Sequence, residues 1–200
     1  MICHYLYLRT TTIGHSLYLR ITAISHYLYL RTKGHSLYLR IIVLGYYLYL
    51  RITAILCHYL YLRITVIICH YLYLRITVIL YYYLYLRITV IICHYLYLRI
   101  TVILCHLYLR ITVILYYYLY LRITVILCYY LYLRITVILC HYLYLRITVI
   151  GHYLYLRITV ILCHYLSLRI TVILCYFLYL RIIVIGHYMY FWNYCQFNAP

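Results

Sequence analysis

The sequence predicts an all-β tandem-repeat protein, built from strand–turn units of about twelve residues that form a β-solenoid or an antiparallel β-meander. Three observations support this fold class. A short unit recurs along most of the chain, part of that unit never changes length, and its apolar residues alternate with a period of two. Helical hydrophobic membrane segments, or a chain with no stable fold, are the alternatives.

Sixteen regularly spaced arginines mark the repeat. Successive arginines are twelve residues apart nine times, eleven residues apart five times and nine residues apart once. The full unit reads YLYLRITVILCH; YLYLR recurs unaltered eleven times, and ITV follows the arginine ten times. The array covers residues 1–186, its first copies are the most divergent, and residues 187–200 form a non-repeat tail.

The period of the unit favours strands over helices. In a helix, twelve residues advance about 1200°, so each arginine would be rotated about 120° from the last and no apolar face would persist. In a strand the side-chain period of two divides twelve, so every arginine returns to the same face. Tyr, Tyr, Arg, Thr and Ile then share one face, and Leu, Leu, Ile, Val and Leu share the other.

The junction between ITVI and YLYL is the predicted turn. The block YLYLRITVI keeps its length, whereas shorter units lose a residue at the junction. All five glycines lie there, at positions 14, 34, 45, 151 and 186. These junctions lack the Asn-Gly or Asp-Gly of tight hairpins, which weakens the meander. In the solenoid alternative each unit is one coil, and sixteen arginines would stack about 4.8 Å apart.

The charge distribution excludes several classes of function. The chain has 17 Lys and Arg residues, no Asp or Glu, and a formal charge of +17. Catalysis by carboxylates, Ca²⁺ or Mg²⁺ sites built on acids, and internal salt bridges are therefore ruled out. We expect non-specific attraction to polyanions only, because the arginines occur singly and no nucleic-acid-binding signature is present.

The cysteines and histidines do not form a specific ligand pattern. Thiolate and imidazole are zinc ligands, yet neighbouring residues of a strand point to opposite faces, and no C-x₂-C grouping occurs. A disulfide framework and Cys-His nucleophilic catalysis are not supported either, since every candidate pair has near-identical copies. We predict no catalytic, cofactor-binding or metal-binding residues, no cofactor and no enzymatic activity. The Cys-His dipeptides are at 3–4, 57–58, 69–70, 93–94, 105–106, 140–141 and 163–164.

A membrane-associated or membrane-embedded structural repeat protein is the alternative function. At most eleven uncharged residues separate consecutive arginines, which makes helical spans marginal. Alternating ten-residue strands would also suit a β-barrel-like arrangement. The beginning of the chain shows no signal peptide. Localisation is otherwise unknown, with a membrane expected if the protein is expressed.

The leading hypothesis is that the chain is a conceptual translation of a minisatellite, with no specific biochemical function. Identical letters recur where selection on a fold would let Leu, Ile and Val interchange. A duplicated DNA unit of 36 nucleotides, with 33-nucleotide variants, explains this. We expect no specific partner, but self-association is possible, because long uncharged runs rich in β-branched and aromatic residues pair edge to edge.

Overall fold

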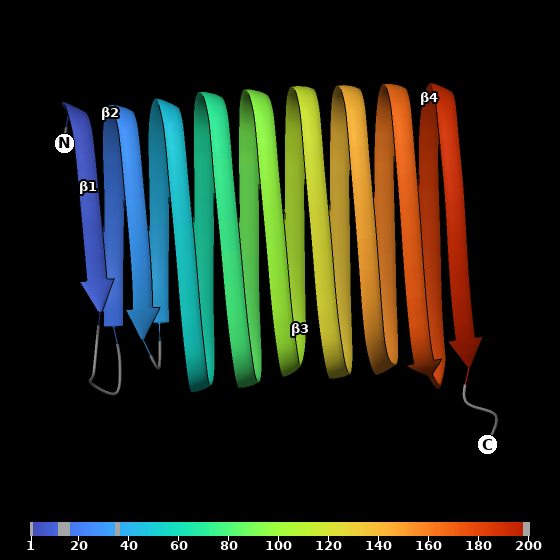
Figure 1. The fold of residues 1–200 in the computed structure, drawn as a ribbon. Coiled ribbons are helices and arrows are strands. Elements are labelled where there is room, and N and C mark those ends of the chain that lie inside the picture. The colour runs from blue at the N-terminus through green and yellow to red at the C-terminus, as the bar shows by residue number, and fades with distance from the viewer. Residues whose placement is uncertain (1, 12–16, 35–36, 198–200) are drawn as a thin grey trace.

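The computed structural model is a stack of parallel strands wound around one axis (Figure 1). It describes residues 2–11, 17–34 and 37–197. Four strands follow one another: β1 (Ile2–Thr11), β2 (Leu17–Gly34), β3 (Leu37–Cys175) and β4 (Phe177–Phe197). Strand β3 is 139 residues long because it winds around the axis many times without a break. The predicted all-β repeat fold is confirmed, and it is a β-solenoid.

Neighbouring strands are parallel, so the antiparallel meander is not formed. Identical positions of the repeat face one another: Leu6 pairs with Leu28, and Leu154 pairs with Leu178. These partners are 22 and 24 residues apart, which is two units rather than one. The expectation of one unit per coil was therefore wrong, because each coil contains two.

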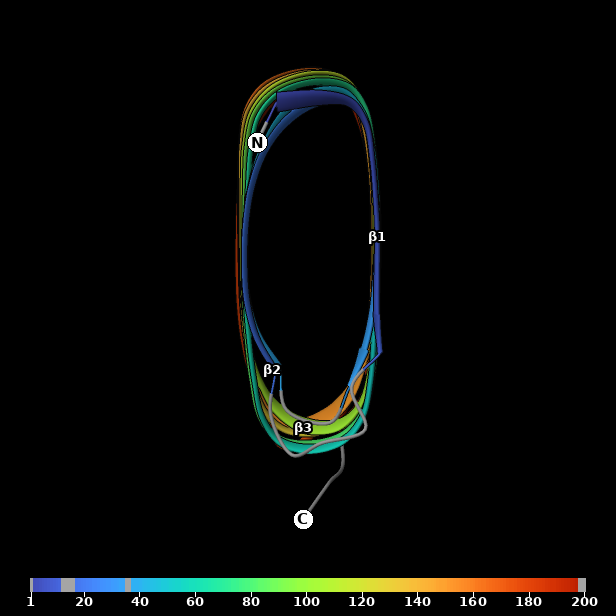
Figure 2. The same cartoon turned by 90° about the vertical axis from the view of Figure 1, so that its left-hand side faces the viewer.

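The cross-section explains the two-unit coil. Viewed along the axis, the solenoid is a flattened ring with two long sides joined by two curved ends (Figure 2). Each long side is one unit, and the two sides turn their aliphatic faces toward each other. Two facing sheets need a separation of about 10 Å for their side chains to interdigitate. A twelve-residue coil is too short to enclose two such faces, whereas two units supply one face each.

Most of the interior of the described residues consists of the aliphatic positions of the repeat. In a representative unit Leu60 is 2% exposed, and Leu62, Ile64 and Val66 are fully buried. The intervening tyrosine, arginine and threonine side chains point outward. The alternation predicted from the period of two is therefore confirmed over YLYLRITV.

The corner departs from the predicted alternation at the last leucine of ITVIL. Leu104, Leu127, Leu162 and Leu174 have φ of 53 to 56° and are 41 to 55% exposed, so this leucine is not on the inner face. A residue in the left-handed region interrupts the alternation, and the strand turns the corner. Register shifts occur at two of these sites, between Ile161 and Cys163 and between Ile173 and Cys175. After Leu127, Leu162 and Leu174 the following cysteine is buried again.

The tail after Gly186 continues the solenoid although its letters leave the repeat. Within β4, Met189, Phe191, Asn193 and Cys195 pair with the buried positions 166, 168, 170 and 172 of the preceding coil. The strand continues to Phe197 because backbone pairing does not require the repeat's side chains. Within the described residues, no helix has the length and hydropathy to cross a bilayer.

Candidate functional site

Continuous rows of stacked tyrosine rings cover the outer faces of the solenoid. Equivalent tyrosines of successive coils lie directly above one another, because the strands are parallel and in register. On one long side, ladder A contains nine tyrosines, with ring centroids 4.8 to 5.1 Å apart. Its members are Tyr5, Tyr27, Tyr47, Tyr71, Tyr95, Tyr118, Tyr142, Tyr165 and Tyr188.

Ladder B runs beside ladder A on the same side, two residues further along each strand. It contains seven stacked tyrosines, with centroids 4.6 to 4.9 Å apart: Tyr7, Tyr29, Tyr49, Tyr73, Tyr97, Tyr120 and Tyr144. Ladder C lies on the opposite long side and contains eight: Tyr18, Tyr38, Tyr61, Tyr85, Tyr108, Tyr132, Tyr155 and Tyr179.

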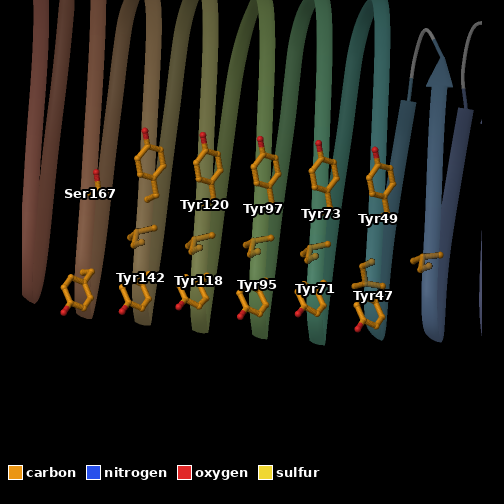
Figure 3. Close-up of a pocket in the computed structure, with 18 of the residues that line it drawn as sticks. Tyr47, Tyr49, Tyr71, Tyr73, Tyr95, Tyr97, Tyr118, Tyr120, Tyr142 and Ser167 are labelled. Carbon is orange, nitrogen blue, oxygen red and sulfur yellow. The ribbon is translucent and has the colours of Figure 1, made fainter.

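Ladders A and B form the walls of a long groove. The groove has a volume of about 1150 Å³, and its floor is formed by the leucines between the two tyrosines of each strand. Figure 3 shows the two rows of rings, with Tyr47, Tyr71, Tyr95 and Tyr118 in one row and Tyr49 in the other. A groove of this kind presents ring edges rather than ring faces, because each face is covered by the next ring in the ladder.

An arginine row accompanies each tyrosine face. Since Arg9 pairs with Arg31 and Arg31 with Arg51, the arginines stack as the tyrosines do. Two units per coil divide the sixteen arginines into two rows on opposite sides, where a single row was expected. The row beside ladder B ends at Arg169, whose guanidinium carbon lies 4.3 Å from the ring centroid of Trp192.

Ladder B is interrupted at Ser167, which replaces the second tyrosine of its unit. Ser167 pairs with Tyr190, and its neighbour Tyr165 stacks on Tyr142 and on Tyr188. Ser167 therefore lies between Tyr144 and Tyr190. Figure 3 shows that the row of rings stops where the Ser167 hydroxyl stands. This interruption is a local feature of the groove that the other copies lack.

The Cys-His dipeptides divide their side chains between the interior and the surface. Cys69, for example, is 2% exposed, whereas His70 belongs to an outer row of rings in which its centroid is 4.7 Å from that of His94. One dipeptide cannot place both side chains on one metal ion in this arrangement. Among the described residues, no group of three or more His and Cys side chains could hold a metal. The side chains of Cys3, Cys57, His58 and Cys105 lie outside the described set.

Buried cysteines meet across neighbouring coils. The Sγ atoms of Cys69 and Cys93 are 2.7 Å apart. This hydrogen bond, together with burial, raises the pKa of the Cys69 thiol. The hydrogen bond between Cys140 and Cys163 likewise raises the pKa of Cys140 and lowers that of Cys163. The protonated partner in each pair is a poor nucleophile, because the thiolate is the reactive form.

Comparison of the chain with protein-family profiles, with curated proteins and with solved structures found no match.

The sequence analysis missed the groove between ladders A and B and the interruption at Ser167. A signal was present, since Ser167 is the one residue that breaks YLYLR at its second tyrosine in the array. Its meaning depended on the number of units per coil, because that number decides which tyrosines flank the serine.

Proposed function

We propose that this chain is a non-enzymatic repeat protein encoded by a minisatellite, and that its physical activity is end-to-end self-association. The identity of the repeated letters supports the minisatellite origin. Support for self-association comes from the geometry of the coils: one unit stacks on an equivalent unit throughout the rod. The end coil of one molecule could therefore stack on the end coil of another through the same strand pairing.

The edges of the terminal coils are the observation that carries the self-association. The outer edges of β1 and β4 have no partner strand within the described residues. The last coil also leaves part of the core open, since Leu178, Leu180 and Ile182 are only partly buried. Unpaired strand edges and open apolar ends are templates for pairing with another copy. Head-to-tail contacts of this kind do not close, so they generate filaments.

Replacement of Leu180 by lysine tests the end-to-end contact. An inward charge at the last coil hinders docking of a second copy, because the charge would be buried without a partner. The matched control is Thr112→Lys, which adds the same charge to the outer face in the middle of the rod. We expect Leu180→Lys to reduce the mass measured by light scattering several-fold and Thr112→Lys to leave it unchanged. A wild-type protein that stays monomeric would contradict the proposal.

The codons of the array test the minisatellite origin. Recent duplication predicts that the copies share codons as well as amino acids. Extensive synonymous variation among the copies would contradict that origin, since it would mean that selection has held the amino acids constant. Detection of the tryptic peptide ITVILCHYLYLR, Ile135–Arg146, by mass spectrometry would establish that the array is translated.

Association with a membrane surface is a second candidate. The end of the rod exposes Tyr188, Tyr190, Trp192 and Tyr194 next to the arginine row that ends at Arg169. Aromatic rings favour the bilayer interface, and basic residues are attracted to anionic lipids. Co-sedimentation with anionic but not with neutral vesicles is the result expected for this candidate. Equal sedimentation with both, or with neither, would contradict it.

A further inference from the structure

We propose that the interruption of ladder B at Ser167 is a binding site for one flat aromatic ring that carries a negative charge. We call this position the Ser167 slot, defined by Ser167, Tyr144, Tyr190 and Arg169. The proposal goes beyond self-association, because it concerns a ligand on the long side of the rod and not the contact between its ends.

The spacing of the strands gives the slot the width of one ring. Tyr144 and Tyr190 belong to coils on either side of Ser167, so two strand spacings, about 9.6 Å, separate them. In the uninterrupted part of the ladder, neighbouring rings such as Tyr120 and Tyr144 are 4.9 Å apart. A flat ring placed halfway across the slot would therefore have the ordinary ladder spacing to both neighbours.

The slot also exposes ring faces, which the rest of the groove does not. Each interior tyrosine of ladder B is covered on both sides by its neighbours. At the slot, one face of Tyr144 and one face of Tyr190 have no ring against them, and Tyr190 is 65% exposed. An aromatic ligand could stack on both faces at once, and ladders A and C offer no such position between their ends.

The charges around the slot favour an anion. Arg169 lies two residues beyond Ser167 on the same face of the strand, and the chain contains no Asp or Glu to neutralise it. Trp192 lies 4.3 Å from the Arg169 guanidinium carbon, which holds that group beside the slot. The Ser167 hydroxyl adds a small hydrogen-bonding group at the base. A carboxylate on the ring's edge would therefore meet Arg169 while the ring stacks on the tyrosines.

Equilibrium dialysis with 2-naphthoate tests the slot. The method measures bound ligand whether the protein is dispersed or assembled. The wild-type chain should bind one molecule per chain and quench Trp192, the single tryptophan of the sequence. Ser167→Tyr restores the repeated YLYLR and fills the slot, so it should lose at least ten-fold in affinity. Equal binding by Ser167→Tyr and wild type would overturn the proposal.

A gain of binding is the complementary test, and it does not depend on the behaviour of Ser167→Tyr. Tyr120→Ser removes one ring from the middle of ladder B and creates a second slot beside Arg122. We expect two molecules of 2-naphthoate per chain for this variant. The matched control Tyr120→Phe keeps the ring and should bind one. A stoichiometry that stays at one for Tyr120→Ser would overturn the proposal, as would binding of many molecules along the whole groove.

Discussion

Tyr116 occupies a position in the interior that cysteine occupies in neighbouring coils. Its column contains Cys93 on one side and Cys140 on the other. Tyr116 is 4% exposed, and its hydroxyl lies near the Cys93 thiol but makes no hydrogen bond of good geometry among the described residues. Burial, with the nearby thiols adding to it, raises the pKa of Tyr116 well above its ordinary value. An unpartnered buried hydroxyl lowers stability, because its hydrogen bonds to water are lost on folding.

Tyr116→Phe is therefore expected to stabilise the solenoid. The change removes the hydroxyl and keeps the ring, and we expect a gain of about 1 kcal/mol in the free energy of unfolding. Thermal unfolding followed by circular dichroism measures it as a higher Tm. Tyr117→Phe is the matched control, since the Tyr117 side chain is 50% exposed. An unchanged or lower Tm for Tyr116→Phe would show that the hydroxyl has a partner.

Tyr116 also predicts that the stability of the solenoid depends on pH. The buried Tyr116 hydroxyl keeps its proton at a pH at which the same hydroxyl of the unfolded chain has lost it, because burial raises its pKa. The free energy of unfolding therefore falls as the pH rises above the ordinary tyrosine pKa of about 10. Tyr116→Phe lacks this loss. The difference in Tm between the variant and the wild type should thus widen as the pH rises above about 10. All other tyrosines titrate equally in both proteins, so a constant difference would contradict this assignment.

At the scale of the element, the corner explains why the short unit between Arg146 and Arg157 carries a glycine. The eleven-residue unit that contains Gly151 lacks the outward corner leucine of the preceding coil, so its backbone lies tightly against that coil. A Cβ at position 151 would lie 2.5 Å from the backbone oxygen of Cys128. Backbone atoms cannot move aside as a flexible side chain can, and glycine is the residue that allows this approach.

Gly151→Ala is expected to destabilise the solenoid by about 1 to 3 kcal/mol, because the strand must shift to make room for the methyl group. The measurement is the free energy of unfolding in denaturant. Thr148→Ala, in the same unit but on the outer face, serves as the control and should change it by less than about 0.5 kcal/mol. Equal effects of the two substitutions would mean that the corner has room for a side chain.

Much of this element was predictable, and the limits have a physical cause. The period of two determines the inward residues, such as Leu62 and Ile64, whatever the coil contains. The number of units per coil was not predictable, because nearly identical units produce the same face pattern with one or two. The outward position of Leu162 was also missed, since a single residue in the left-handed region leaves no mark in hydropathy. The Ser167 slot could not be predicted because the number of units per coil decides which tyrosines flank Ser167.

At the scale of the whole molecule, repulsion between the unbalanced positive charges is the main electrostatic interaction that opposes folding. The arginines form two rows on opposite sides, with neighbours about 4.8 Å apart at the backbone. Each neighbouring pair costs on the order of 1 kcal/mol in water, and no acid in the chain relieves it. The two rows are separated by the apolar core, which makes the repulsion weaker than in one row of sixteen.

Salt should therefore stabilise the rod. Raising the ionic strength from about 0.01 M to 0.15 M shortens the screening length from about 30 Å to about 8 Å and weakens the repulsion within each row. We expect Tm to rise with added salt, and to rise more with sulfate than with chloride at equal ionic strength. A Tm that is independent of salt would contradict this account. Arg110→Gln, which removes one charge from a row, should itself raise Tm at low salt.

The two-unit coil has a consequence for inheritance. Because the two halves of a coil are nearly equivalent, gain or loss of one 36-nucleotide copy by slippage during DNA replication would lengthen or shorten the rod by half a turn. Every later copy would move to the opposite long side and would occupy an equivalent position there. Alleles with odd and even copy numbers would thus encode rods of the same cross-section. The length of such a gene could therefore change over generations while the protein kept the same fold.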